Sequence, residues 1–289
     1  MRAASLTLLL FMSLTTTPAP AETIQVIAIG AHPDDCDIKA GGIAAKYAAL
    51  GHNVRFVSVT NGDAGHQAEG GGMLAARRRA EAQESGRRLG IEYIVLDNHD
   101  GELVPSLDVR LQIIRQIREW DADIVIAPRP NDYHPDHRYT GILVQDASYM
   151  VTVPNIASDT PAIKKNPLFL YFSDRFSRPQ PFRPDIVVSI DDVMEKKYSA
   201  LDAHVSQFYE WLPWHAGVLD EVPTDPDGRL AWLKSQRSFA IRDEWREAAR
   251  ARYGADADGI RNAEAFEITE YGMQPSEDQI RALMPFFPQ

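Results

Sequence analysis

A short apolar run that ends in a polar loop, TIQVIAIGAHPDDCD at residues 23–37, constrains the fold of this chain more than any other stretch. The apolar side chains of residues 24–29 occupy both faces of an extended segment, a pattern typical of a strand buried within a parallel sheet. His32, Asp34 and Asp35 follow that strand directly. Because open α/β sheets bind ligands at the carboxyl ends of their strands, the sequence predicts a functional site in this loop.

Strand-like apolar runs alternate with helical patterns through the first half of the chain. Strands are expected at 54–59, 93–96 and 123–127, and helices at 41–50, 73–89, 109–120 and 139–150. This alternation predicts an α/β fold with a Rossmann-like, doubly wound and mainly parallel sheet. In a C-terminal elaboration we expect strands at 168–172, 185–190 and 263–269, helices at 193–209 and 229–252, and a loop at 211–228. Residues 22–289 show no clear linker and are expected to form a single domain.

The amino terminus has the pattern of a secretory signal peptide. Arg2, an apolar run at residues 6–14 and the sequence Ala19-Pro20-Ala21 match its charged start, short hydrophobic middle and cleavage site. We therefore expect residues 1–21 to be removed and the protein to be exported to the periplasm or the extracellular space, with a retained membrane tether as the alternative. The apolar run is too short to span a bilayer, so no stable membrane insertion is expected.

Charge and cysteine content argue against a nucleic-acid partner and against an internal disulfide. The chain of 289 residues has a formal net charge of −11, which disfavours a nucleic-acid partner because phosphate binding needs a basic surface. Cys36 is the one cysteine, so an internal disulfide is excluded. We expect its thiol to be buried beside the polar loop, with a role as metal ligand as the alternative.

A second polar patch, PRPNDYHPDHR at residues 128–138, follows the strand expected at 123–127. If the first and fourth strands are neighbours, the two polar loops meet at one edge of the sheet. Together they supply His32, Asp34, Asp35, His134, Asp136 and His137. Catalytic zinc sites use three His or carboxylate ligands and keep one position open, so two His and one Asp of this set would suffice. A carboxylate beside a ligand would then serve as base, and a His would stabilise an oxyanion or protonate a leaving nitrogen.

These motifs resemble those of the zinc-dependent PIG-L, or LmbE-like, N-acetylglucosaminyl deacetylases. The family's A/P-H-P-D-D motif matches residues 31–35, and its H-x-D-H motif matches residues 134–137. Weaker matches cover most of the remaining chain: Thr60-Asn61-Gly62, Arg78-x-x-Glu81, Leu89-Gly90-Ile91, Asp100-Gly101, Lys197-x-x-Ala200, His204-x-Ser206-Gln207 and Ala263-Glu264-Ala265-Phe266. One departure is Cys36, which stands where the family commonly has an acidic residue.

The resemblance implies roles for the residues of the two main motifs. His32, Asp35 and His137 would hold one Zn²⁺ per chain, and another divalent metal such as Fe²⁺ is the alternative. Asp34 would act as general base and His134 as the acid or oxyanion stabiliser. Asp136 would orient His134.

Three further residues are expected near the substrate, each with a structural alternative. Arg78 matches a family position that reaches substrate hydroxyls, or else pairs with Glu81 or Glu84 on an exposed helix face. Asp100 would accept sugar hydroxyls, or else forms an Asp-Gly turn. His204 would contact the substrate, or else packs in the core.

The expected function is therefore hydrolytic removal of an acyl group, most simply acetyl, from the nitrogen of an amino sugar in a glycan or glycoside. The alternatives are an amidase for a larger amino-sugar or thiol-sugar conjugate and a carbohydrate-binding protein that keeps the metal for structure. A nucleotide-binding role is disfavoured because AHPDD stands where a G-x-G-x-x-G phosphate loop would be. The wall facing the substrate is expected from residues 65–72, 155–167 and 211–214.

Overall fold

A seven-stranded sheet in the order β3-β2-β1-β4-β5-β7-β6 organises the computed structural model, which describes residues 23–288. Its strands are β1 (Gln25–Gly30), β2 (Asn53–Thr60), β3 (Glu92–Asn98), β4 (Ile124–Ala127), β5 (Leu168–Phe172), β6 (Ile186–Ser189) and β7 (Ala263–Gly272). The first five strands pair in parallel, whereas β7 runs antiparallel to both β5 and β6. The expected α/β fold with a mainly parallel sheet is thus confirmed, and β1 lies beside β4.

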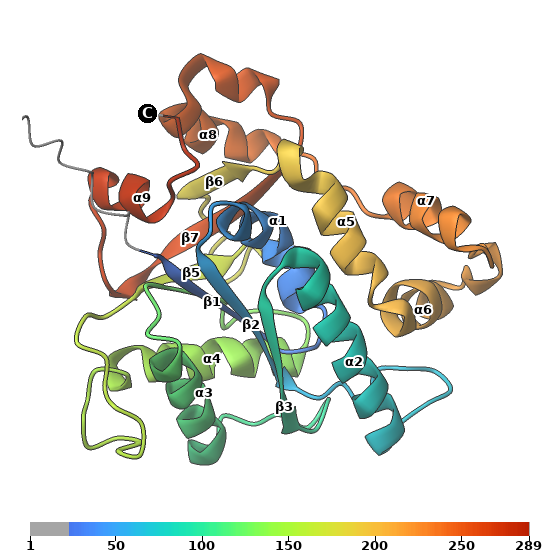
Figure 1. Cartoon of the computed structure of the whole chain (residues 1–289), viewed down its shortest axis with the longest axis horizontal. Coiled ribbons are helices and arrows are strands. Elements are labelled where there is room, and N and C mark those ends of the chain that lie inside the picture. The colour runs from blue at the N-terminus through green and yellow to red at the C-terminus, as the bar shows by residue number, and fades with distance from the viewer. Residues whose placement is uncertain (1–22, 289) are drawn as a thin grey trace, which may run out of the picture.

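Helices cover both faces of this sheet (Figure 1). On one face lie α1 (Asp35–Ala49), α2 (Gly71–Leu89) and α5 (Met194–Asp202), and on the other lie α3 (Leu107–Glu119) and α4 (Pro135–Met150). The shorter helices are α6 (Leu212–Ala216), α7 (Pro226–Gln236), α8 (Arg246–Tyr253) and α9 (Glu277–Leu283). This is the doubly wound arrangement, in which each helix buries its apolar stripe against one face of the sheet.

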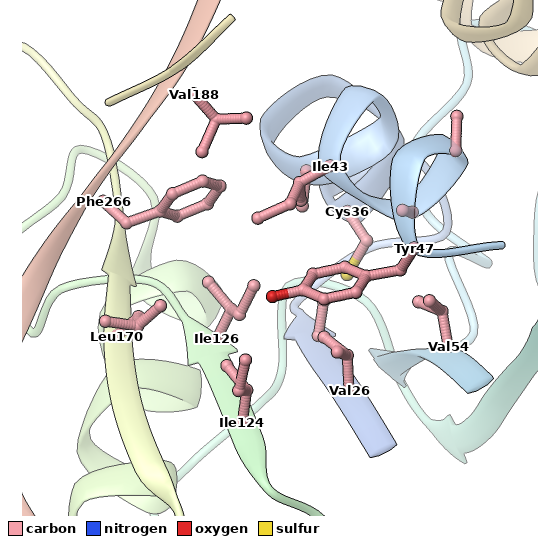
Figure 2. Close-up of a cluster of buried hydrophobic side chains, with 14 of the residues drawn as sticks. Val26, Cys36, Ile43, Tyr47, Val54, Ile124, Ile126, Leu170, Val188 and Phe266 are labelled. Atoms are coloured by element: carbon pink, nitrogen blue, oxygen red, sulfur yellow. The ribbon is translucent and has the colours of Figure 1, made fainter. Parts of the chain in front are cut away.

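The first strand contributes to both hydrophobic cores. Val26 and Ala28 pack in the core beneath α1 and α2, whereas Ile27 and Ile29 pack in the core beneath α3 and α4. Figure 2 shows the first of these cores, where the Cys36 sulfur lies among apolar side chains of α1 and the sheet. Burial raises the pKa of the Cys36 thiol well above its usual range. The expected burial of this cysteine is confirmed, and its thiol packs in the hydrophobic core.

Element boundaries differ from expectation in two regions. Helix α1 begins at Asp35, six residues before the expected start, because Asp35 and Asp37 in its first turn interact favourably with the helix dipole. The helix expected at 229–252 is wrong: α7 ends at Gln236 and α8 begins at Arg246. Between them, Ala240 forms an isolated antiparallel β-bridge with Asn262, which lies just before β7.

The chain between α5 and α7 is more helical than expected. The helix expected at 193–209 ends at Asp202, and a π-helical turn over Ser206–Trp211 leads into α6. The loop expected at 211–228 therefore contains α6 and the start of α7. Pro213 and Pro226 lie in the first turns of these helices, where a missing N–H costs no hydrogen bond.

The signal peptide expected at residues 1–21 lies outside the described residues. Within residues 23–288, every helix is too short or too polar to cross a membrane.

Gly141 allows α4 to approach the segment that leads to His134. A β-carbon at this position would lie 2.7 Å from the carbonyl oxygen of Pro128 and 2.9 Å from that of Arg129. These backbone atoms cannot move without shifting the loop. We therefore expect Gly141→Ala to lower the free energy of unfolding by about 1–3 kcal/mol, although alanine favours helices.

Urea or thermal unfolding measures this effect, with Gly72→Ala in α2 as the matched control. An added β-carbon at Gly72 would meet nothing within 4 Å, so this variant should be as stable as the parent or slightly more stable. Equal midpoints for the two variants would show that α4 does not need the close approach.

Candidate active site

The loops after β1 and β4 meet at one edge of the sheet because these two strands are adjacent and parallel. His32 lies in the first loop, and His137 lies in the first turn of α4. The carbonyl oxygen of Ala31 accepts hydrogen bonds from the backbone N–H and the hydroxyl of Thr60, both at 2.8 Å, and from the Ser58 hydroxyl at 3.1 Å. The end of β2 therefore fixes the first loop.

Three predicted ligand atoms form a compact triangle. His32 Nδ1 lies 3.1 Å from His137 Nε2 and 3.6 Å from Asp35 Oδ2, and the distance between His137 Nε2 and Asp35 Oδ2 is 3.4 Å. Ligand atoms around a tetrahedral ion with bonds of about 2.0–2.1 Å would be about 3.3 Å apart. Backbone N–H groups of Ala31 and His32 hold Asp35 Oδ2 in place at 2.9 Å each. This His/Asp cluster is suited to a divalent metal.

The second nitrogen of each histidine faces carboxylates. His32 Nε2 lies 3.1 Å from Asp100 Oδ1 and 3.3 Å from Asp136 Oδ2, and His137 Nδ1 lies 3.0 Å from Asp132 Oδ1. Metal-binding histidines usually donate their free N–H to such a carboxylate, which fixes the tautomer and the ring orientation. The sequence analysis missed Asp132. Its place in the same loop, five residues before His137, is the signal that could have found it.

The charges of the site also suit a cation. Five carboxylates, those of Asp34, Asp35, Asp100, Asp132 and Asp136, surround the three imidazoles and one guanidinium, that of Arg78. These carboxylates act on the pKa values of His137 and His32. Burial lowers the pKa of His137, but Asp35 and Asp132 raise it to about 9. Burial likewise opposes the effect of the carboxylates on His32, whose pKa nevertheless lies well above its usual value.

Two other sets of side chains could also hold a metal, because the ligand atoms within each set lie within 4.8 Å of one another. One set is His32, His134 and His137, and the other is His32, Asp100 and Asp136. The second set offers one imidazole and two carboxylates. The set with Asp35 offers two imidazoles and one carboxylate, and each of its imidazoles has a carboxylate behind it. It therefore fits a metal best.

Arg78 links the polar loop to the rest of the site. Its Nη2 donates to Asp34 Oδ1 at 3.1 Å, and its Nη1 reaches the Gly62 carbonyl at 3.3 Å as well as Asp100. Only 2% of Arg78 is exposed, so its alternative as a surface residue paired with Glu81 or Glu84 is wrong. Gly62 has a φ of +73°, which favours glycine, and a β-carbon there would also lie 2.6 Å from Arg78 Nη1.

Asp136 does not orient His134 through its carboxylate, and this detail of the prediction is wrong. The carboxylate faces His32 and Gly101 instead. The backbone N–H of Asp136 donates to His134 Nδ1 at 3.2 Å, because His134 is the N-cap residue of α4. The two-residue spacing of the motif therefore orients His134 through the Asp136 N–H. The Asp136 carboxylate can then face the neighbouring loop.

His204 does not contact the substrate pocket, so its expected substrate role is wrong and its structural alternative holds. Only 1% of the residue is exposed. Its Nε2 lies 3.1 Å from Asp37 Oδ2, although the two atoms are not aligned as a hydrogen bond. Asp37 also accepts a hydrogen bond from the Ser85 hydroxyl.

Asp100 lines the pocket, but both of its oxygens are engaged by His32 and Arg78, so it positions these two groups.

A cavity of about 720 Å³ opens over the ligand triangle, a size usual for small-molecule sites. As expected, Gly65 and Trp211 line it, whereas residues 155–167 do not. The sequence analysis missed residues 174–176, Arg237 and Arg242, which complete its wall. A smaller hollow of about 190 Å³ beside His52 and Trp120 lies at the amino ends of β2 and β3.

The comparisons with known proteins agree with this geometry. Residues 27–148 match the PIG-L family, described as GlcNAc-PI de-N-acetylase. A diacetylchitobiose deacetylase from Thermococcus kodakarensis is 35% identical over 204 residues, which cover 66% of this chain and 73% of that protein. A 4-oxalmesaconate hydratase from Pseudomonas putida is 24% identical over 195 residues, which cover 65% of this chain and 75% of that protein.

A solved structure shows the same similarity in three dimensions. The N,N'-diacetylchitobiose deacetylase from Pyrococcus horikoshii is similar to this chain with a TM-score of 0.63 and 29% identity, over 88% of this chain and 87% of that protein. The chain therefore belongs to the PIG-L family of de-N-acetylase enzymes.

Proposed function

We propose that this chain is a zinc-dependent hydrolase that removes the acetyl group from an N-acetylglucosamine unit of a glycan or glycoside. The observation that carries the proposal is the triangle of His32 Nδ1, Asp35 Oδ2 and His137 Nε2 beneath an open cavity. The relatives also support deacetylation, because the similarity to a deacetylase, at 35% identity, exceeds that to a hydratase, at 24%.

In this proposal, Asp34 receives the proton of the attacking water. A zinc ion held by His32, Asp35 and His137 would supply Lewis acidity to the amide carbonyl and to the water. Arg78 fixes Asp34 Oδ1, while Oδ2 has no hydrogen-bond partner among residues 23–288 and Asp34 lines the cavity. Asp34 would therefore hold the proton until the leaving nitrogen takes it up.

His134 would donate a hydrogen bond to the carbonyl oxygen as negative charge develops there. Its Nδ1 accepts the backbone N–H of Asp136, so the ring proton of the neutral imidazole resides on Nε2. Burial lowers the pKa of His134, which favours the neutral ring. A neutral donor aimed at the reacting oxygen suits stabilisation of an oxyanion.

We also propose that the enzyme acts after export, on amino sugars of the cell envelope or the environment. The signal-peptide pattern of residues 1–21 supports this location.

Asp34→Asn tests the proposed base. Zinc-loaded wild-type protein should release acetate from N,N'-diacetylchitobiose, and chelation of the metal should stop the release until zinc is restored. The variant should keep its zinc but lose about 10²–10⁴-fold in kcat, because asparagine cannot accept the proton. Asp97→Asn, an exposed carboxylate at the end of β3, is the matched control and should keep full activity. Wild-type turnover in Asp34→Asn would remove Asp34 from the mechanism.

Asp132→Asn tests the carboxylate behind His137. Loss of its charge should weaken zinc binding by about 10–100-fold, since a metal ligand loses the partner that orients it and raises its basicity. Competition with a chromophoric chelator measures the zinc dissociation constant, and Asp159→Asn on the exposed surface serves as control. An unchanged constant in Asp132→Asn would show that His137 does not need Asp132 to bind the metal.

A further inference from the structure

Four positive side chains line the cavity, and we call them the cationic wall: those of Lys39, Arg175, Arg237 and Arg242. None of them has a carboxylate partner within 3.5 Å among residues 23–288. The nearest pair is that of Arg242 Nη1 with Glu244 Oε1 at 3.9 Å, and the Glu244 side chain is 66% exposed. In a chain with a net charge of −11, four cations without close partners along one wall require an explanation.

The carboxylates of the cavity are already engaged elsewhere. Asp34 and Asp100 pair with Arg78, and Asp35 and Asp132 face the imidazole nitrogens. The fifth, Asp174, lies next to Arg175 in the chain, but both of its oxygens accept hydrogen bonds from Arg129 at 2.7 Å. None of these five carboxylates therefore forms a close ion pair with a cation of the wall.

Uncharged partners hold three of these cations in place. Lys39 Nζ donates to the carbonyl oxygen of Ser173 at 2.9 Å, and Arg242 Nη1 donates to that of Asp174 at 2.8 Å. The Arg242 guanidinium also lies 4.5 Å from the centre of the Trp245 ring, and that of Arg237 lies 5.2 Å from the Phe208 ring. Carbonyl and aromatic partners orient a cation but leave its charge available to a ligand.

The position of the wall relates it to the reaction centre. Residues 173–175 follow β5, which pairs in parallel with β4, so this loop lies at the same edge of the sheet as the loop of His134. Arg78 and Asp100 lie on the other side, in elements next to β2 and β3. A sugar bound over the ligand triangle would thus meet neutralised pairs on one side and Lys39, Arg175 and Arg242 on the other.

We propose that Lys39, Arg175, Arg237 and Arg242 form an anion-binding wall, and that the substrate is an N-acetylated amino sugar bearing a carboxylate or a phosphate. This inference rests on the proposed deacetylase function and narrows its substrate class. Guanidinium groups with free N–H donors match the geometry of both anions and bind them with charge-assisted hydrogen bonds.

Paired neutral and anionic substrates test the proposal on the zinc-loaded protein. N-acetylmuramic acid is compared with its methyl ester, which has nearly the same size without the charge, and N-acetylglucosamine 6-phosphate is compared with N-acetylglucosamine. We expect kcat/KM to be at least about tenfold higher for the anionic member of one pair, and the advantage to shrink as salt rises. The two pairs separate a carboxylate from a phosphate as the preferred anion.

Charge-removing variants assign the preference to the wall. Arg237→Gln and Arg242→Gln should each reduce the ratio of anionic to neutral kcat/KM by about tenfold, whereas Arg250→Gln on the exposed face of α8 should leave it unchanged. Equal activity on both members of both pairs would overturn the proposal. So would equal losses on charged and neutral substrates in the variants, which would mean that the arginines only balance the charge of the metal site.

Failure of the deacetylase function gives a different result. If the zinc-loaded protein releases no acetate from any of these sugars, the proposed reaction is wrong, and calorimetry with the same four sugars then tests the wall. Tighter binding of an anionic sugar, lost in Arg242→Gln, would retain the anion-binding wall. Equal or undetectable binding of charged and neutral sugars would exclude it.

Discussion

The imidazoles of His32 and His137 each have carboxylates on one side and face each other on the other side, and the rest of the active edge depends on this arrangement. The adjacent pairing of β1 and β4 brings the two rings together. The helices that follow these strands, α1 and α4, begin at the site, and their amino ends favour the carboxylates gathered there. The excess of negative charge suits a divalent cation.

Segments that match the weaker family motifs support the His32, Asp35 and His137 cluster from a distance. Glu264 of β7 accepts hydrogen bonds from the N–H groups of Gly42 and Ile43 at 2.7 and 2.8 Å, and it also pairs with the buried Lys197. These contacts fix α1, whose first residue is Asp35. Glu81 and Gln207 act on the other side of the cavity: Glu81 accepts the Ser206 N–H at 3.0 Å, and Gln207 donates to the Gly65 carbonyl at 3.0 Å.

Much of the site could be predicted from the sequence because it depends on short-range patterns. A buried strand followed by a polar loop occurs twice, and the strand order then brings the two loops together. Sequence spacing does not tell which nitrogen of a ring faces which carboxylate, so the partners of Asp136 and the role of Asp132 needed the structure. The sequence left two roles open for His204, because burial against Asp37, 167 residues away in the chain, leaves no local signal.

The cationic wall was missed for a related reason. Lys39, Arg175 and Arg242 come from three distant segments, and only tertiary packing places them along one cavity. The break between α7 and α8 was also missed, because this stretch has the composition of one long helix. Its interruption lets residues 240–242 bridge to the sheet through Asn262 and places Arg242 beside the loop after β5.

The position of the metal tests the account most directly. Crystals grown with zinc, measured on both sides of the zinc absorption edge, locate the ion by its anomalous signal. The account predicts one peak per chain, within bonding distance of His32 Nδ1, Asp35 Oδ2 and His137 Nε2, at about 2.0–2.2 Å from each. A peak between His32 Nε2, Asp100 and Asp136, or no peak in protein that is active without metal, would contradict it.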